Sequence, residues 1–304
     1  MNILEKNAQK YFGLTILLSA SLGLFLPSLG MKLNFLVIPS LFVLMFYTAL
    51  KINFNKLQQS VFKIKYLVIG TLISFIIIPL ILYIIAHLFN FNDMQKMSVV
   101  LSALAPTILS APYFVAVMKG DVEFAFILSV LLTFLSPFII PLELYFLFQS
   151  NIDISVVEIF KSILYLIFIP VLIAYIIKKI RLNIGEVLLS KEHTAISVVF
   201  FVFIWAIISV NADSILSLSS YILEVLLISI IQEFGFFFVI LKISRKFLSN
   251  SMSKSFAFSI AVKNTALTAG IAIVYSNDLS LVSSMVVLMH VPMFAYIFWK
   301  KDKI

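Results

Sequence analysis

The residue in this chain best suited to chemistry is a lysine inside an apolar stretch. Residues 255–276 form a hydrophobic run, and Lys263 lies nine residues beyond the basic boundary at Lys254. At 1.5 Å per helical residue this is about 13 Å, close to the middle of a hydrocarbon layer about 30 Å thick. An ammonium there must face a cavity or a carboxylate. Lys263 therefore predicts a functional site, the alternative being a lysine that only caps a distorted helix.

Two prolines mark a second run that should take part in this site. Pro106 and Pro112 lie six residues apart within 97–118, and each removes a helical donor. Broken backbone at mid-membrane depth is tolerated where it is buried in protein or lines a cavity, so it commonly marks a transport site; the alternative is an ordinary proline kink. Freed amides and the positive ends of half-helices suit an anion. We expect the substrate to lie near Pro106, Ser110, Asn264 and Thr265.

A counter-charge for Lys263 can be sought among the acidic residues. Most lie in loops or at helix ends, and Glu143 and Glu224 lie toward the outer ends of their runs. Glu233 lies near the middle of the run 222–241, at about the depth of Lys263, and Gln232 before it is an accessory candidate. We therefore expect Glu233 to pair with Lys263. If Lys263 can release and rebind a proton, protons become the coupling ion; otherwise the protein is a uniporter or exchanger.

The sequence lacks the common enzymatic and metal-binding motifs. It contains no cysteine and none of the patterns GxxxxGK[ST], GxGxxG, HExxH or GxSxG. The three histidines are too far apart for a metal site, and only His290, midway along its run before Pro292, is retained as an accessory candidate. We therefore expect no catalytic residues, metal ligands or cofactor.

The elements that must position these residues are membrane spans. Of the 304 residues, 62% are hydrophobic and 12% are charged, which excludes a soluble globular protein. Although the net charge is +8, the basic residues lie between apolar runs, so nucleic acid is not an expected partner and the lipid bilayer is. Ten spans are predicted, at 11–29, 34–50, 66–89, 97–118, 124–148, 158–177, 194–210, 222–241, 255–276 and 280–298.

Basic residues predict how these spans are oriented. Eighteen of the 22 Lys and Arg residues fall in one alternating set of segments, which includes both ends of the chain. Short loops rich in Lys and Arg stay in the cytoplasm, so both termini are expected there, with the protein in the cell membrane. The run 11–29 exceeds the core of a signal peptide, so we expect a retained helix.

An even number of spans divides the chain into two halves of opposite orientation. Residues 1–150 would hold five helices and residues 151–304 the other five, within a single transport unit. The loops after the second and the seventh span each carry four basic residues. Such an arrangement is typical of an inverted repeat.

Several short motifs resemble the bile acid:sodium symporter family. Ala105-Pro106, the turn Lys119-Gly120-Asp121-Val122 and the segment Ser136-Pro137 to Pro141 are similar to that family's fourth helix, following turn and fifth helix. Lys263-Asn264-Thr265-Ala266-Leu267 is similar to its Gln-Asn-Ser-Gly-Leu segment. The resemblance implies a core of helices three to five and eight to ten, a panel of one, two, six and seven, and crossing broken helices four and nine. Family members move organic anions, usually with sodium.

The positions that the resemblance assigns to sodium ligands are mostly changed. A ligating Glu falls at Ser259 and a ligating Gln at Lys263. The family's Ser-Asn pair falls at Ala111-Pro112 and one hydroxyl position at Ala125, while another keeps its hydroxyl as Ser129. The resemblance therefore implies a related transporter that does not depend on sodium.

These observations predict a secondary or facilitative transporter of a small organic anion, working by alternating access, with Lys263 in place of a sodium ion. An auxin-efflux-carrier type is the alternative within transport. A polytopic membrane enzyme is the alternative from another class, and it would need paired catalytic groups that the sequence lacks. A purely structural membrane protein would not need charges at mid-membrane depth.

Overall fold

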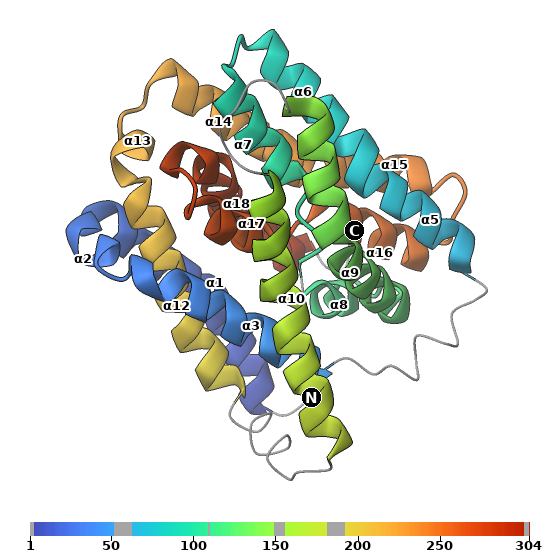
Figure 1. Ribbon diagram of the computed structural model, residues 1–304. Coiled ribbons are helices and arrows are strands. Elements are labelled where there is room, and N and C mark those ends of the chain that lie inside the picture. The colour runs from blue at the N-terminus through green and yellow to red at the C-terminus, as the bar shows by residue number, and fades with distance from the viewer. Residues whose placement is uncertain (1–2, 52–62, 109, 149–155, 181–191, 301–303) are drawn as a thin grey trace. The chain divides into compact units, whose positions relative to one another are not determined.

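The chain is built from helices. The computed structural model describes residues 3–51, 63–108, 110–148, 156–180, 192–300 and 304, and within these ranges no β-strand occurs (Figure 1). An isolated antiparallel bridge joins Thr107 to Lys263. The predicted all-α class is thereby confirmed.

The first of two compact units comprises residues 1–52 and 161–218. Its centre is α12 (Glu192–Val210), which packs against α1 (Ile3–Phe25), α2 (Pro27–Met31) and α3 (Val37–Lys51). Most of α10 (Val156–Lys179), the turn η1 (Asn34–Leu36) and α13 (Ala212–Leu216) complete the unit. Gly30 lies so close to Ser209 that an added Cβ would come within 2.7 Å of the serine Cβ.

The second unit comprises residues 53–160 and 219–304. From the first half of the chain it takes α5 (Ile64–Leu72), the π-helical segment η3 (Ile73–Ile77), α6 (Ile78–Leu88), α7 (Asp93–Ala103), α8 (Ala111–Val117) and α9 (Val122–Phe148). From the second half it takes α14 (Ser220–Ile230), the π-helical segment η4 (Ile231–Gly235), α15 (Phe236–Ser244), α16 (Asn250–Ala261), α17 (Thr265–Ala272) and α18 (Asn277–Lys300).

Each unit thus draws on both halves of the chain. The unit with the first, second, sixth and seventh predicted spans corresponds to the expected panel, and the other corresponds to the expected core. The predicted halves 1–150 and 151–304 are repeats along the chain, not compact units, and that division stays a prediction.

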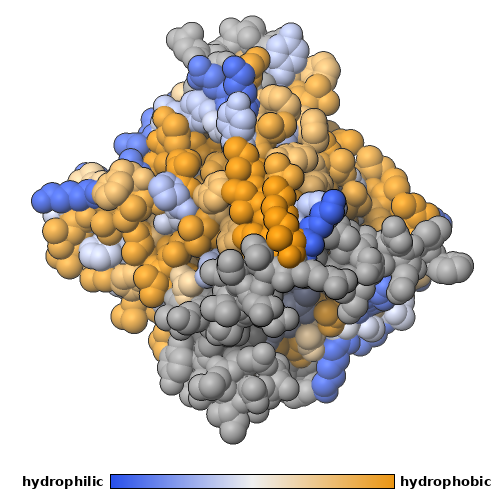
Figure 2. All heavy atoms as spheres, turned by 60° about the horizontal axis from the view of Figure 1, so that its bottom comes forward, coloured by the Kyte–Doolittle hydropathy of each residue, from blue (hydrophilic) through white to orange (hydrophobic). Residues whose placement is uncertain are grey.

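Apolar helices long enough to cross a membrane occur in both units. In the described part of the chain five qualify by length and composition: Ile64–Leu88, Val122–Phe148, Val157–Lys179, Ser220–Ser244 and Asn277–Lys300. Leu14–Phe25, Asn34–Leu50 and Ala195–Val210 are shorter apolar helices. Large apolar side chains cover much of the face in Figure 2, and Phe146 is 68% exposed. Exposed apolar surface on this scale indicates a lipid environment.

Two of the long helices share an unusual local geometry. Ile64–Leu88 and Ser220–Ser244 both have 25 residues, and each contains a five-residue π-helical segment near its middle. There the amides of Ile78 and Phe236 donate to carbonyls five residues back, on Ile73 and Ile231. Such segments widen the helix and leave backbone groups for other partners. Both segments supply polar side chains to the second unit.

Candidate functional site

Two interrupted helices form the centre of the second unit. The first interruption lies between α7, which ends at Ala103, and α8, which begins at Ala111; the second lies between α16, which ends at Ala261, and α17, which begins at Thr265. Both occur where the sequence predicts them. Pro106 has no amide to donate, and Pro112 lies in the first turn of α8, where its missing amide costs little.

The two interruptions are hydrogen-bonded to each other. The Ile108 amide donates to the Val262 carbonyl at 3.1 Å, and the Asn264 amide donates to the Pro106 carbonyl at 2.7 Å. The Thr107 hydroxyl donates to the Ser259 carbonyl. We call this arrangement of residues 106–108 and 259–264 the clasp. Sequence reasoning treated the amides freed at the breaks as ligand donors, but those of Ile108 and Asn264 bind the opposite segment.

Lys263 belongs to the clasp and is fully buried. Its ammonium donates to the Ser74 carbonyl oxygen at 3.0 Å and to the Ser74 hydroxyl, and it lies 5.9 Å from the centre of the Phe75 ring. Pro79 explains why that carbonyl is free: within η3 it would accept from the amide five residues ahead, and proline has none. The Lys263 ammonium thus donates to the Ser74 carbonyl, which has no backbone donor because residue 79 is proline.

The expected pairing of Lys263 with Glu233 is not formed. Glu233 is fully buried on η4, and its Oε1 lies 2.9 Å from Nδ1 of His290 on α18. The carboxylate that acts electrostatically on Lys263 is Glu143, a half-buried residue of α9. Similar depth was the basis for choosing Glu233, but depth does not specify which way a side chain points around its helix.

Three hydroxyls at the breaks lack a hydrogen-bond partner. They are those of Ser259, Thr265 and Ser110, and each oxygen is buried. Asn264 is occupied differently, because its side-chain oxygen accepts from the Leu267 amide at 3.4 Å and so caps α17. A buried hydroxyl without a partner is costly, so these three are the groups available to a bound molecule.

The remaining predicted site residues lie outside the clasp. Ser129 donates to the Ala125 carbonyl of its own helix at 2.6 Å. Gln232 lies on η4 and exchanges two hydrogen bonds of 3.2 Å with Ser102, near the end of α7. The structure therefore brings together Lys263, Asn264, Thr265, Ser259, Pro106 and, at the start of α8, Ser110 and Pro112.

Two residues that interact with Lys263 were not predicted from the sequence. Glu143 was set aside for its distance along the fifth span, and Ser74 was not considered. A signal for Ser74 did exist, because a hydroxyl residue stands five positions before Pro79 in an otherwise apolar run. That spacing alone could not indicate the partner.

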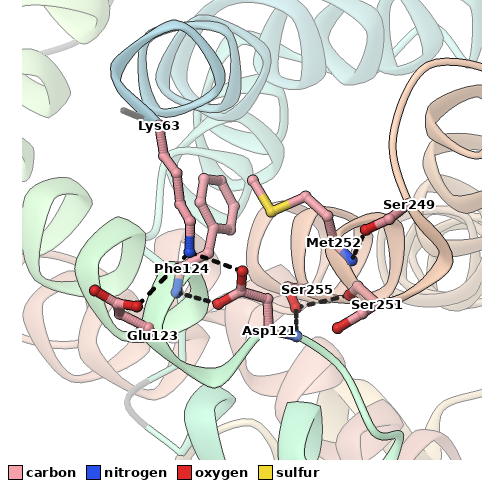
Figure 3. Close-up of polar contacts among 8 residues, drawn as sticks. All are labelled: Lys63, Asp121, Glu123, Phe124, Ser249, Ser251, Met252 and Ser255. Atoms are coloured by element: carbon pink, nitrogen blue, oxygen red, sulfur yellow. Dashed lines mark hydrogen bonds and ion pairs between the residues drawn. The ribbon is translucent and has the colours of Figure 1, made fainter. Parts of the chain in front are cut away.

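A polar cluster holds the turn between α8 and α9 against α16. Figure 3 shows the Lys63 ammonium beside Asp121, at 2.8 Å, and Glu123, at 3.7 Å. The Asp121 amide donates to the Ser255 hydroxyl at 2.5 Å. Partial burial alone would raise the pKa of Asp121, but the Lys63 ammonium and the amides at the start of α9 outweigh it and hold this pKa below its ordinary value. The cluster fixes the ends of the helices that flank the clasp.

Carboxylate and imidazole groups do not gather as a metal site would require. Among the described residues, no three His, Cys, Asp or Glu side chains are grouped closely enough to hold a metal ion. Among the described residues at the two breaks, the side-chain oxygens without a hydrogen-bond partner are hydroxyls, while the Lys263 ammonium is bound to Ser74.

Comparison with known proteins gives two results. Residues 38–218, more than half of the chain, match the profile described as the Sodium Bile acid symporter family. A curated protein from Bacillus subtilis (strain 168), the "Uncharacterized sodium-dependent transporter YocS", is 22% identical over 278 residues, which cover 91% of this chain and 86% of the relative. The resemblance noted in the sequence is confirmed: the chain belongs to the sodium bile acid symporter family.

Proposed function

We propose that this membrane protein is a secondary or facilitative transporter of a small organic anion, working by alternating access, and that Lys263 replaces a coupling sodium ion. The observation that carries the proposal is the fully buried ammonium of Lys263 in the clasp. A charge at that depth is costly to bury, so its retention favours a functional role. Family membership supports transport rather than catalysis.

An anionic substrate suits the groups around the clasp. Lys263 supplies positive charge, and the unpartnered hydroxyls of Ser259, Thr265 and Ser110 can donate to carboxylate oxygens. A substrate that accepts these bonds would relieve their cost and would be favoured over one that cannot. In alternating access the two broken helices must face one side of the membrane and then the other. The backbone hydrogen bonds of the clasp join the two breaks and would make them move together.

The same groups disfavour a sodium ion. Sodium needs several oxygen ligands, whereas the unpartnered groups at the breaks are three hydroxyls. Lys263 lies in the same interrupted segment as Ser259 and Thr265, and its ammonium would repel a second cation at low dielectric. The word "sodium-dependent" belongs to the name of the Bacillus relative. In this chain the Lys263 ammonium would supply the positive charge that a bound sodium ion supplies in a sodium-coupled transporter.

We also propose that the ten predicted spans form a five-plus-five inverted repeat, residues 1–150 and 151–304, with both termini in the cytoplasm. Matching details support the repeat. Ser98 is the sixth residue of α7 and meets the start of α18, at the Leu279 carbonyl; Ser255 is the sixth residue of α16 and meets the start of α9, at the Asp121 amide. The π-helical segments η3 and η4 occupy corresponding spans.

Uptake into proteoliposomes tests this function. Organic acids that raise the thermal midpoint of the purified protein would first be identified, because a molecule that binds only the folded state stabilises it. Uptake of those acids should persist when choline replaces sodium, and Lys263→Gln should abolish it. Lys242→Gln, which changes an exposed lysine at the end of α15, is the matched control and should transport normally. A strict sodium requirement would refute the proposed role of Lys263.

A further inference from the structure

A buried acid and base lie together outside the clasp. Glu233 is 0% exposed and His290 is 2% exposed, and Oε1 of the carboxylate lies 2.9 Å from Nδ1 of the imidazole. The other oxygen, Oε2, and the other ring nitrogen, Nε2, are both buried without a hydrogen-bond partner. Buried polar atoms rarely lack a hydrogen-bond partner, so Oε2 and Nε2 are each available to bind a ligand or a proton.

A proton is the species that fits these two atoms. With one proton on Nδ1, the imidazole is neutral, it donates to the carboxylate, and the pair carries a charge of −1. A second proton can bind at Nε2, which gives an imidazolium, or at Oε2, which gives a carboxylic acid. Either site brings the net charge of the pair to zero and leaves the Nδ1 to Oε1 contact intact. Binding of the second proton therefore removes a net charge from the protein interior, where a charge has a high desolvation free energy.

The pair is connected to both sides of the break between α7 and α8. Gln232, adjacent to Glu233, donates to the Ser102 carbonyl near the end of α7 and accepts from the Ser102 hydroxyl. On the other side, the His290 ring stacks on Phe294 at 5.6 Å, and Phe294 stacks on Phe114 of α8 at 3.9 Å. A change in the charge or hydrogen bonding of the pair would reach α7 through one contact and α8 through the other.

Other ionisable groups on the packed elements do not join the pair. η4 packs against α14, α15, α16 and α18, while α18 packs against α7, α8, α14 and α17. In the described part of the chain none of their titratable side chains makes an ion pair or hydrogen bond with Glu233 or His290; they are Tyr221, Glu224, Lys242, Lys254, Asp93, Lys96, Tyr113, Asp278, Tyr296 and Lys300. Lys263, which follows α16, is bound to Ser74. In the described residues the pair therefore has no third ionisable group in direct contact with it.

We propose that Glu233 and His290 form a proton-binding site, and that its loading is linked to the break between α7 and α8, so that the proton is the coupling ion of transport. This inference rests on the proposed transport function and gives it a coupling ion. The pair then binds the coupling proton, and Lys263 supplies positive charge for the anion. The step moves one proton on and off Nε2 or Oε2 and requires no other reactant.

Proton binding can be measured on the purified protein without a substrate. The chain has three histidines, so His87→Gln together with His193→Gln leaves His290 as the only ¹⁵N-histidine signal in detergent micelles. The ¹⁵N signals of its ring nitrogens should change across a pH series, and Glu233→Gln should move that change along the pH axis, because the two groups share protons. Glu224→Gln, on the same long helix, is the matched control and should leave the pH of that change unaltered. A His290 signal that does not titrate, or that ignores Glu233→Gln, overturns the site.

The link to the break can be measured by hydrogen exchange at a single pH. Glu233→Gln holds the position neutral, so the amides of residues 104, 105, 107, 108, 110 and 111 should exchange several-fold faster or slower than in the unmodified chain, while Glu224→Gln should have no effect. Identical exchange in all three proteins would overturn the link. If Glu233→Gln does not fold, the titration of His290 in the otherwise unmodified chain and the exchange of His290→Gln decide the same points.

These results are separable from those that test transport. If His290 does not titrate while uptake in choline persists, the proton site is wrong and the transport function stands. If His290 titrates with Glu233 but uptake strictly requires sodium, the sodium-independent function is wrong and the proton site stands.

Discussion

Replacement of Ser74 by alanine gives a direct measure of how firmly the buried ammonium is held. In the folded protein the ammonium of Lys263 has the Ser74 hydroxyl and the Ser74 carbonyl as hydrogen-bond acceptors. Ser74→Ala removes the hydroxyl and leaves the carbonyl, which Pro79 keeps free of a backbone donor. The change is small in volume and adds no polar group, so its effect reports the lost hydrogen bond.

The size of the effect follows from the charge of the donor. A hydrogen bond to a charged group contributes about 1.5–3 kcal/mol, against about 0.5–1.5 kcal/mol for a neutral one. Because about 1.4 kcal/mol is a factor of ten, Ser74→Ala should raise the unfolding equilibrium constant by about 10-fold to about 140-fold. The matched control is Ser229→Ala. Ser229 is also fully buried in a long apolar helix, but its hydroxyl donates to the neutral Val225 carbonyl at 2.8 Å.

A double-mutant cycle isolates the contact. Lys263→Met removes the ammonium while keeping a long apolar side chain, so Ser74→Ala in that background should cost less than about 0.5 kcal/mol. The assay is equilibrium unfolding in mild detergent with increasing sodium dodecyl sulfate, followed by far-ultraviolet circular dichroism. The reasoning is refuted if Ser74→Ala costs no more than Ser229→Ala, or if its cost is the same with and without Lys263.

Three further predictions concern other parts of the chain. Gly30→Ala should destabilise the protein by about 1–3 kcal/mol in the same assay, because its Cβ would lie 2.7 Å from the Ser209 Cβ, and Ser209→Gly should recover part of the loss. The lowered pKa of Asp121 contributes stability that is present above its ordinary value of 3.8 and is lost as pH falls through the folded value. Asp121→Asn and Lys63→Gln should therefore each make the thermal midpoint less steeply dependent on pH below about 4; an unchanged slope would contradict this. Asn264→Ala should abolish uptake of an identified acid and cost about 0.5–2 kcal/mol through the lost helix cap, so surviving uptake would show that the site is misplaced.

Several features follow from the sequence because they depend on position along a helix. The apolar runs predict helices, and helices occupy them. Pro106 and Pro112 predict the interruption of the fourth span, because a residue without an amide breaks a helix in any surroundings. Lys263 is predicted to be buried at mid-membrane depth, since depth follows from the number of residues and the rise per residue.

Only the tertiary structure decides which side chains meet. Successive residues turn by about 100° around a helix, so two groups at the same depth can face opposite ways. This is why Glu233 contacts His290 while Lys263 contacts Ser74, although depth alone favours the pairing of Glu233 with Lys263. The clasp has the same origin. The sequence predicts broken backbone at Pro106 and at Lys263, but the amides released there find partners only because segments more than 150 residues apart in the sequence lie side by side. Residue type and spacing predict where a helix is interrupted, whereas tertiary packing decides which residues the interrupted segments contact.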